Sequence, residues 1–434
     1  MQKLRSFLIA GLVLIFIPSC AGLRQGGKEQ NYSSDMAKLQ RQLTVNPNDP
    51  AALRDLGVVY FQTNRYEPAK SYLSRSYSQV KDDPRTIFYY GMTLEYLEDI
   101  QGALSVYINY SEVPAISQYR KLIEGRYRSL THEFIRRQFK QLVADEQKLG
   151  TEKIAPKAVA VFPLTYQGTD PRYEVLGKGL SEMILIDLGQ VKSLQLVERI
   201  RIEALLEEIQ FGQSASVDRS SAPRMGKLLS AGRIVSGSFN VNNFNLRMDV
   251  AAWDIVAKKF PGFQSGSDEL DKLFRIQKEL VFGIIRELGI TLTVEEREKI
   301  QLVPTRNTFA FLTYCLALKS EDARDFRAAK VLYNEAASLD PGFNLAKSKA
   351  EAMEALSIAG GPKENALLAA EELELGPKKA KKKTNLVLDR LRHLGQGIGG
   401  TFNSGEDNRK TVEEAGRNGA GVGRLPEPPP PPGR

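Results

Sequence analysis

Few residues of this chain have the types and spacing that catalysis requires. The sequence contains two histidines, His132 and His393, and two cysteines, Cys20 and Cys315. Neither histidine has a cysteine or an acidic ligand cluster beside it, so a zinc site and a Ser-His-Asp triad both lack their parts. We therefore expect no enzyme activity, no metal and no cofactor, and a protein that works by binding.

Two short motifs could present charge or backbone amides to a ligand. Gly-Lys-Gly at 177–179 opens an expected helix but lacks the other elements of a phosphate loop, so a structural turn is the favoured interpretation. Glu198 and Arg199 lie between a strand and a helix, where an ion pair or a helix cap explains them. The polar side of that helix carries three carboxylates that we expect to be solvated: Glu203, Glu207 and Glu208.

The N-terminus has the layout of an export signal. Two basic residues precede an apolar run over 7–17, which is about half of the roughly 20 residues that a membrane span needs. Ile17 and Ser19 occupy the places where bacterial lipoprotein signals carry an apolar and a small residue before the cysteine. The resemblance implies a signal peptide over 1–19 and a diacylglycerol on the sulfur of Cys20. An ordinary secretory signal with an incidental cysteine is the alternative.

The charge of the chain is concentrated at its ends. The formal net charge is +8, of which the signal carries two and the segment 377–434 carries six, so the body between them is neutral. A nucleic-acid partner is therefore not expected. Five lysines between 378 and 383 could contact anionic lipid or an acidic partner, with a solvated linker as the simpler interpretation.

An internal repeat covers the first part of the exported chain. Four pairs of residues share an offset of 34 residues: Leu56 with Tyr90, Gly57 with Gly91, Tyr60 with Leu94, and Ala69 with Ala103. This period and the alternation of small and large residues are typical of tetratricopeptide repeats, in which helix pairs stack. A similar unit over 311–343 contains Cys315, which we expect to be a small core residue.

A stacked repeat offers a concave surface to a peptide or a partner helix. We expect the aromatic side chains of the repeats to be mostly core residues, with one or two in the groove. The candidates for protein binding are Tyr60, Tyr66, Tyr89 and Tyr96. Apolar residues over 116–149 predict a long amphipathic helix that ends the repeats, with His132 as a surface or interface residue.

The middle of the chain changes period. Short β-rich runs and helical runs alternate in the order β-α-β-α-α-β-β-α, which predicts a layered α/β domain. The last two strands are expected to meet in a tight turn at Asn242 and Asn243, because asparagine tolerates positive φ.

These segments resemble the soluble domain of the curli production assembly/transport lipoproteins and of envelope proteins of the TolB N-terminal type. The matching stretches are VAVFPL, LGKGLSEMILIDL, LQLVERIRIEALLEEIQFGQS and MGKLLSAGRIVSGSF, over about 158–290. The resemblance implies a layered α/β fold, a periplasmic location and a lipid anchor. Curli exporters form a pore from additional long alternating strands, and no such pair is visible here, which argues against a pore.

The predicted fold class is therefore a multi-domain α+β/α protein with an N-terminal tetratricopeptide α-solenoid, a central layered α/β domain like that of the curli transport component, a C-terminal helical hairpin and a disordered tail. The expected segments are a signal peptide 1–19, a linker 20–48, repeats and capping helix 49–150, the α/β domain 155–295, C-terminal repeat-like helices 305–360 and a basic, Pro-rich tail 361–434.

The expected function is that of a scaffold or assembly factor of the cell envelope or of a secretion apparatus. Its expected partners are other envelope proteins and the membrane, with a homo-oligomer also open. Ala21 after the lipidated cysteine is not the aspartate that retains lipoproteins at the inner membrane, which favours the outer membrane. An oligomeric export channel of the curli type is the alternative function.

Overall fold

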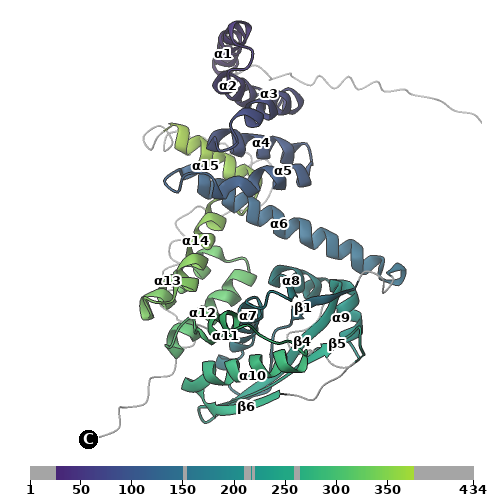
Figure 1. The fold of residues 1–434 in the computed structure, drawn as a ribbon. Helices are drawn as coiled ribbons and strands as arrows, with labels where there is room; N and C mark the ends of the chain where they lie inside the picture. The colour runs from purple at the N-terminus through teal and green to yellow at the C-terminus, as the bar shows by residue number, and fades with distance from the viewer. Residues whose placement is uncertain (1–25, 150–153, 210–216, 218–219, 259–263, 376–434) are drawn as a thin grey trace, which may run out of the picture. The chain divides into compact units, whose positions relative to one another are not determined.

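The computed structural model describes residues 26–149, 154–209, 217, 220–258 and 264–375 (Figure 1). The chain divides into two compact units, one up to Glu98 and one from Asp99 onward. The predicted signal, the lipidation site Cys20 and the part of the tail after 375 lie outside the described residues.

The described part of the first unit consists of helices. They are α1 (Gly26–Val45), α2 (Pro50–Gln62), α3 (Tyr66–Gln79) and α4 (Pro84–Tyr96). Asp49 caps α2 by accepting a hydrogen bond of 3.0 Å from the amide of Ala51, and Asp83 caps α4 in the same way. In both caps a proline follows the aspartate at the first helical position, where its missing N–H costs nothing.

The expected linker 20–48 is wrong for most of its length, because α1 occupies it. Met36, Leu39 and Leu43 follow one another at helical spacing and are half-buried, and α1 packs on α2. These three apolar residues form a short stripe on an otherwise polar helix, so the sequence of α1 resembles that of a linker.

Helix starts recur at the predicted period. α2 begins at Pro50 and α4 at Pro84, and α3 begins at Tyr66 while α5 (Ile100–Tyr107) begins at Ile100, each pair 34 residues apart. The N-terminal helical region is thus confirmed, and the assignment to tetratricopeptide repeats stays a prediction. The first unit ends inside the expected repeat segment 49–150, because the long helix α6 (Gln118–Ala144) packs against later parts of the chain.

A mixed sheet lies in the second unit. Its strands follow the order β3-β1-β4-β5-β6, with β2 paired to β4. The strands are β1 (Ala155–Val161), β2 (Thr165–Tyr166), β3 (Gln195–Leu196), β4 (Ala231–Asn242), β5 (Asn245–Asp254) and β6 (Gln264–Glu269). β1 runs parallel to β3 and β4, whereas β4, β5 and β6 are antiparallel.

The predicted order of strands and helices is confirmed, with two strands added. β2 is only two residues long, and β6 lies in a polar segment for which the expected order contained no strand. β6 is an edge strand, which is consistent with its polar sequence. One of its faces lies on α10 (Leu273–Glu287), where the missing side chain of Gly266 makes room for Ile276.

The hairpin between β4 and β5 turns one residue later than expected. Asn242 pairs with Asn245, and the turn residues are Asn243 and Phe244, with φ of 48° and 59°. Two consecutive positive φ angles are typical of a type I′ turn, which has the twist that antiparallel strands need. The second position is occupied by a bulky residue that rarely adopts this conformation, which is why the prediction missed it.

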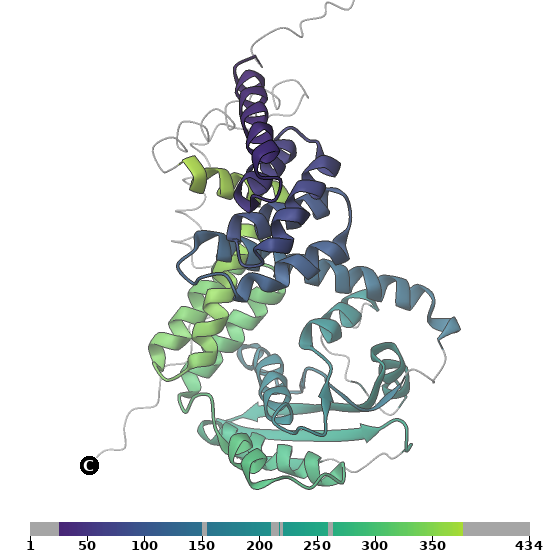
Figure 2. The same ribbon diagram turned by 45° about the horizontal axis from the view of Figure 1, so that its top comes forward.

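Helices cover both faces of the sheet (Figure 2). Val159 and Val161 point to the face covered by α7 (Leu176–Leu188) and α10, whereas Ala160 and Phe162 point to the opposite face. That opposite face is covered by α8 (Arg199–Glu208), α9 (Ala222–Leu229) and the last turns of α6. Short 3-10 segments complete this part of the chain at Ile108–Ser111, Glu146–Lys148, Pro171–Tyr173 and Leu270–Lys272.

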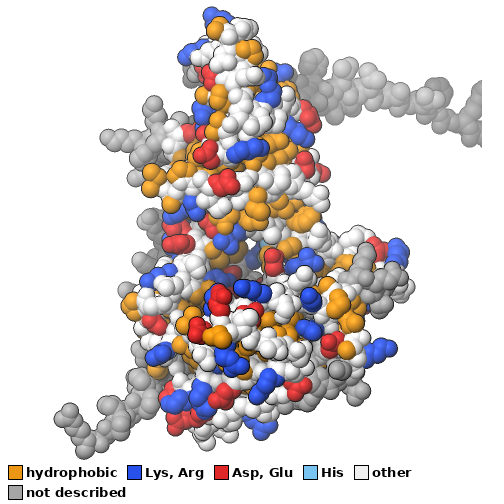
Figure 3. Space-filling view, viewed as in Figure 1, with side chains coloured by type: hydrophobic (Ala, Val, Ile, Leu, Met, Phe, Trp, Pro, Cys, Tyr) orange, Lys and Arg blue, Asp and Glu red, His pale blue; other side chains and the backbone are white. Residues whose placement is uncertain are grey.

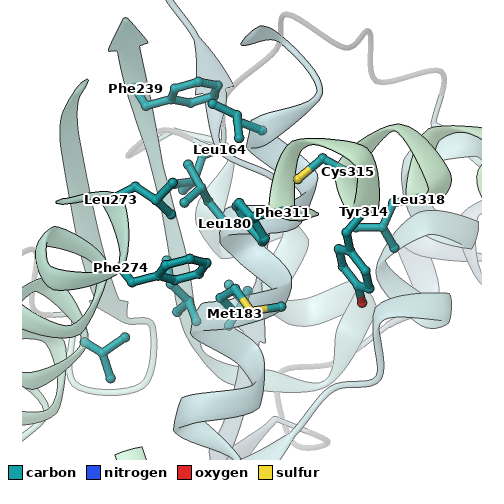
Figure 4. Packing of buried hydrophobic residues seen from close by; sticks show 14 of the residues in the cluster. Leu164, Leu180, Met183, Phe239, Leu273, Phe274, Phe311, Tyr314, Cys315 and Leu318 are labelled. Atoms are coloured by element: carbon teal, nitrogen blue, oxygen red, sulfur yellow. The ribbon is translucent and has the colours of Figure 1, made fainter. Parts of the chain in front are cut away.

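The C-terminal helices continue the core beyond α7. They are α11 (Val294–Gln301), α12 (Thr308–Asp322), α13 (Phe326–Leu339), α14 (Asn344–Ala359) and α15 (Lys363–Leu375). Figure 4 shows Phe311, Tyr314, Cys315 and Leu318 of α12 beside Leu180 and Met183 of α7. Cys315 is fully buried, as predicted.

The start of the expected tail at 361 is wrong. The segment over 363–375 is rich in alanine, leucine and glutamate, which favour a helix, and it forms α15. Ala366 and Ala370 of α15 are completely buried, and α15 packs against α6 and α14. The helical part of the chain therefore extends to 375.

Candidate functional site

The Gly-Lys-Gly motif lies inside helix α7 and is not a turn, so this prediction is wrong. A Cβ atom on Gly177 would overlap the carbonyl oxygen of Leu164, and one on Gly179 would overlap the sulfur of Cys315. The two glycines allow α7 to approach the chain after β1 and helix α12 closely. The side chain of Lys178, between them, forms an ion pair with Asp322 of α12.

That ion pair belongs to a cluster of seven charged side chains, called here the ion cluster. It contains three cations, Lys178, Arg199 and Lys349, and four carboxylates, Glu182, Glu203, Glu321 and Asp322. The residues come from α7, α8, α12 and α14. The ion cluster therefore joins two helices of the α/β domain to two helices from the C-terminal part of the chain.

Arg199 lies at the centre of the ion cluster. Its Nη2 atom is 3.0 Å from Oδ1 of Asp322 and 3.6 Å from Oε1 of Glu321. Its Nη1 atom is 2.6 Å from Oε1 of Glu203, a distance that makes an ion pair although the angle is not that of a regular hydrogen bond. One guanidinium thus contacts three carboxylates, which its fixed fork of donors permits.

Lys349 extends the ion cluster from α14. Its Nζ atom lies 3.2 Å from Oε2 of Glu321 and 3.3 Å from Oε1 of Glu182. Tyr314 donates a hydrogen bond of 3.0 Å to Glu182, and Tyr333 donates one to Glu321. The carboxylate oxygens that face the helices are therefore paired with donors from several elements.

The surroundings shift the pKa values of these groups strongly. Between 10% and 20% of each side chain is exposed, apart from Lys178 with 31%. Burial acts to lower the pKa of Arg199, but the surrounding carboxylates outweigh it and raise the pKa well above its usual value. Burial acts to raise the pKa of Glu321 and of Asp322, and the neighbouring cations outweigh it and lower both values.

Glu203 differs from the other carboxyl groups. Burial raises its pKa to about 8, Arg199 opposes the shift, and the nearby Asp322 adds to it. The carboxyl groups of Glu203 and Asp322 both contact the guanidinium of Arg199, so two acids meet at one cation, and a proton on Glu203 removes the repulsion between them. With Glu203 protonated, three cations face three carboxylates and the ion cluster is neutral.

The prediction that Glu203 is solvated is therefore wrong, because α8 faces the end of α12. Glu207 and Glu208, one turn further along, are exposed as predicted, and Glu207 lies 3.2 Å from Arg136 of α6. Glu198 occupies the N-cap position of α8 without a side-chain hydrogen bond to the helix, whereas Arg199 forms ion pairs, one of them with Glu203 four residues further on.

The four candidate tyrosines lie in the first unit. Tyr60 is stacked on Tyr72 with the ring centres 5.4 Å apart, and the guanidinium of Arg65 lies over Tyr60 at 4.8 Å. Tyr66 and Tyr96 are stacked at 4.8 Å and are half-buried.

Tyr89 has only 2% of its surface exposed, and its ring meets Phe61 edge-on at 5.6 Å. Tyr66 and Tyr96 thus present more surface than Tyr60 and Tyr89, and binding by any of the four stays a prediction.

A shallow cavity of about 360 Å³ lies between the α12–α13 turn and the end of α14. Arg324, Phe326 and Leu356 are among its lining residues. His132 of α6 lies 3.3 Å from Arg324, and burial followed by the charge of Arg324 lowers its pKa. The predicted interface position of His132 thus corresponds to contact between α6 and this turn.

The residues that the structure describes contain neither a candidate metal site nor a candidate membrane-spanning helix. These residues contain no group of three or more metal-ligating side chains, and none of their helices combines the length and hydrophobicity that a bilayer span needs. Figure 3 shows acidic and basic side chains intermixed over the visible face of the second unit.

Comparisons with known proteins identify the α/β domain. Residues 139–248 match the family model of the curli production assembly/transport component CsgG, so the chain contains a CsgG-like domain, as the sequence predicted. The match includes α7 and α8, with four residues of the ion cluster, and ends before α12. The predicted relation to the TolB type stays a prediction.

Solved structures of other proteins are similar to part of this chain. One of them is the C-terminal domain of LpoB from Salmonella enterica, with 12% sequence identity, a TM-score of 0.21, and an alignment over 30% of this chain and 95% of that one. No curated protein matches the chain.

Proposed function

We propose that this protein is a lipoprotein anchored through Cys20 in the outer membrane, where it faces the periplasm and acts as a non-enzymatic scaffold or assembly factor for an envelope or secretion apparatus. The observation that carries the proposal is a CsgG-like domain in a chain that begins with a lipoprotein-type signal. A diacylglycerol and an added acyl chain give several kcal/mol of membrane affinity, at about 0.8 kcal/mol per buried methylene.

The helical segments before the domain supply the binding surface in this proposal. Their helix starts recur every 34 residues, and the small residues Gly57 and Ala69 lie where α2 meets α3. The stacked pair of Tyr66 and Tyr96 is half-buried, so part of these aromatic side chains is exposed. Such residues are frequent anchors in protein interfaces.

The anchor is tested by metabolic labelling with an alkyne fatty acid. The wild-type protein should incorporate the label and co-sediment with outer membranes, and Cys20→Ser should do neither. Cys315→Ser is the matched control, because Cys315 is buried and should leave labelling unchanged. Export of an unlabelled, soluble wild-type protein would contradict the anchor.

The scaffold role is tested by cross-linking in intact cells and mass spectrometry. Cross-links from the helical segments 50–107 to one or a few defined envelope proteins are expected, and they should be lost in Tyr66→Ala. Tyr72→Ala, which removes a ring stacked elsewhere in the first unit, is the control for loss of packing. A normal set of cross-links in Tyr66→Ala would contradict the assigned surface.

An oligomeric export channel is the second candidate function. The specific observation in its favour is the description of the matching family as a transport component. Conductance of the purified protein in a planar bilayer would support the channel, and its absence, together with a defined partner, would support the scaffold.

A further inference from the structure

The ion cluster links the CsgG-like domain to helices outside the family match. Lys178, Glu182, Arg199 and Glu203 belong to the matched segment, and the remaining members belong to α12 and α14. Behind the ion cluster, α12 packs on α7 through the apolar contact that contains Cys315. Any change in the charge of the ion cluster therefore acts directly on the attachment of these helices.

The number of charges makes this attachment dependent on one proton. Three cations cannot neutralise four carboxylates. Glu203 and Asp322 both pair with the one guanidinium of Arg199, and they repel each other unless one of them keeps its proton. Once the proton is lost, two negative charges face each other in a partly buried site. The excess charge has no further cation in the ion cluster to neutralise it.

We propose that the ion cluster is a pH-sensitive switch: a proton on Glu203, next to Asp322, keeps α12 to α14 attached to the CsgG-like domain, and its loss in mildly alkaline conditions loosens that attachment. The direction follows from linkage. The closed state holds this proton more tightly than an opened state in which Glu203 is solvated, so opening becomes easier as the pH rises. The opening equilibrium therefore changes over the pH range between the ordinary pKa of a glutamate and the raised pKa of Glu203, which is about 8.

The other ionisable groups around Glu203 do not give the same response. α7 contributes Lys178 and Glu182, α12 contributes Glu321 and Asp322, α13 contributes Tyr333, α14 contributes Lys349, and Arg199 lies on α8 itself. Burial raises the pKa of Tyr333, and the carboxylates around Lys349 raise its pKa despite burial, so both stay protonated near neutral pH.

α6 contributes His132 and Arg136 to the surroundings of α8. The lowered pKa of His132 stabilises the closed state as the pH rises, which is opposite to the effect of Glu203. In the described part of the chain no ion pair joins α9 or β1 to the ion cluster. A loss of attachment with rising pH is therefore specific to the carboxyl pair.

The reactivity of the Cys315 thiol can be used to measure opening, because this thiol is completely buried where α12 packs on α7. In the full chain with Cys20→Ser it is the single thiol, so its rate of reaction with a disulfide reagent reports the opening of this contact. Because the variants are compared at the same pH, the effect of thiol ionisation on the reaction rate cancels. The test variant is Glu203→Gln, whose amide is neutral at every pH.

The expected result is a rate ratio that depends on pH. The rate of the background protein, which carries Cys20→Ser alone, is divided by the rate of the Glu203→Gln variant. This ratio should be at least tenfold larger at pH 8 than at pH 6, because each pH unit in this range changes the opening equilibrium by up to about tenfold. Glu207→Gln, an exposed carboxylate on the same helix, should behave like the background protein. Equal rates for Glu203→Gln and the background protein across this range would overturn the proposal.

Misfolding of Glu203→Gln would not prevent the test. Asp322→Asn removes the other carboxylate of the pair and should also abolish the pH dependence of the rate ratio, although the lost pairs with Lys178 and Arg199 make it more reactive at every pH. Persistence of the full pH dependence in folded Asp322→Asn would equally overturn the proposal.

Discussion

The ammonium group of Lys278 lies 2.7 Å from Oδ1 of Asp187, so a buried ion pair joins α10 to α7 on one face of the sheet. Only 9% of Lys278 and 4% of Asp187 are exposed. Gln277 donates a further hydrogen bond of 2.8 Å to the same carboxylate. The pair holds the two helices that cover this face in a fixed register.

Removal of one member of this pair should be costly. Lys278→Met leaves the carboxylate buried without its cation, and we expect a loss of about 3 kcal/mol in the free energy of unfolding, measured by urea denaturation. The double variant Asp187→Leu/Lys278→Met should regain most of that loss, because no uncompensated charge remains. Additive losses in the double variant would show that the two side chains contribute independently and would contradict this account of the pair.

The two glycines of α7 should respond differently to the same substitution. Gly177→Ala places a methyl group against the backbone carbonyl of Leu164, whereas Gly179→Ala places it against the side chain of Cys315. Each should lower the melting temperature, with a cost of about 1–3 kcal/mol for overpacking. Cys315→Ala should rescue Gly179→Ala and not Gly177→Ala, and rescue of both would contradict the described packing.

The turn residue Phe244 should lower stability. It has a φ of 59°, and 57% of its surface is exposed. Phe244→Gly creates an Asn-Gly pair, which suits a type I′ turn, and should raise the free energy of unfolding by about 1 kcal/mol. Ser265→Gly in the neighbouring strand β6, where no positive φ is required, should be neutral or destabilising. A less stable Phe244→Gly variant would show that the aromatic ring contributes packing.

Acid should destabilise the ion cluster through Glu321. Its pKa is lowered in the fold because Lys349 and Arg199 outweigh the effect of burial. The unfolded chain therefore binds the proton more tightly, and the stability is present above the ordinary glutamate pKa and lost as the pH falls toward the lowered value. Glu321→Gln should flatten the fall in unfolding free energy between about pH 5 and pH 3. An unchanged slope would contradict the assigned pairing.

Local patterns in the sequence predicted most strands and helices of the α/β domain, but they did not predict α1, β6 or α15. The apolar periodicity predicted the strand and helix order of the α/β domain, and the period of 34 residues is the spacing between the starts of α2 and α4. The polar edge strand β6 was missed, because strand formation there depends on pairing with β5 and on support from α10. The predicted position of the β4–β5 turn was wrong by one residue, because Phe244 adopts a positive φ that aromatic residues rarely adopt.

The ion cluster could not be predicted, since it depends on contacts between distant segments. Lys178 and Asp322 are 144 residues apart, and the charges of each helix alone are those of a solvated surface. The four-residue spacing of Arg199 and Glu203 suits an ion pair on one helix, but it does not distinguish a buried pair from a solvated one. Packing of α12 against α7 turns that surface into an interior, and the pKa of Glu203 follows from this packing.

The molar mass of the mature protein, extracted in detergent and measured by light scattering with the detergent contribution subtracted, tests the proposed function most directly. A scaffold or assembly factor predicts a monomer, or a small complex with a second envelope protein that can then be identified. A discrete assembly of many identical protomers would contradict the scaffold and favour an export channel.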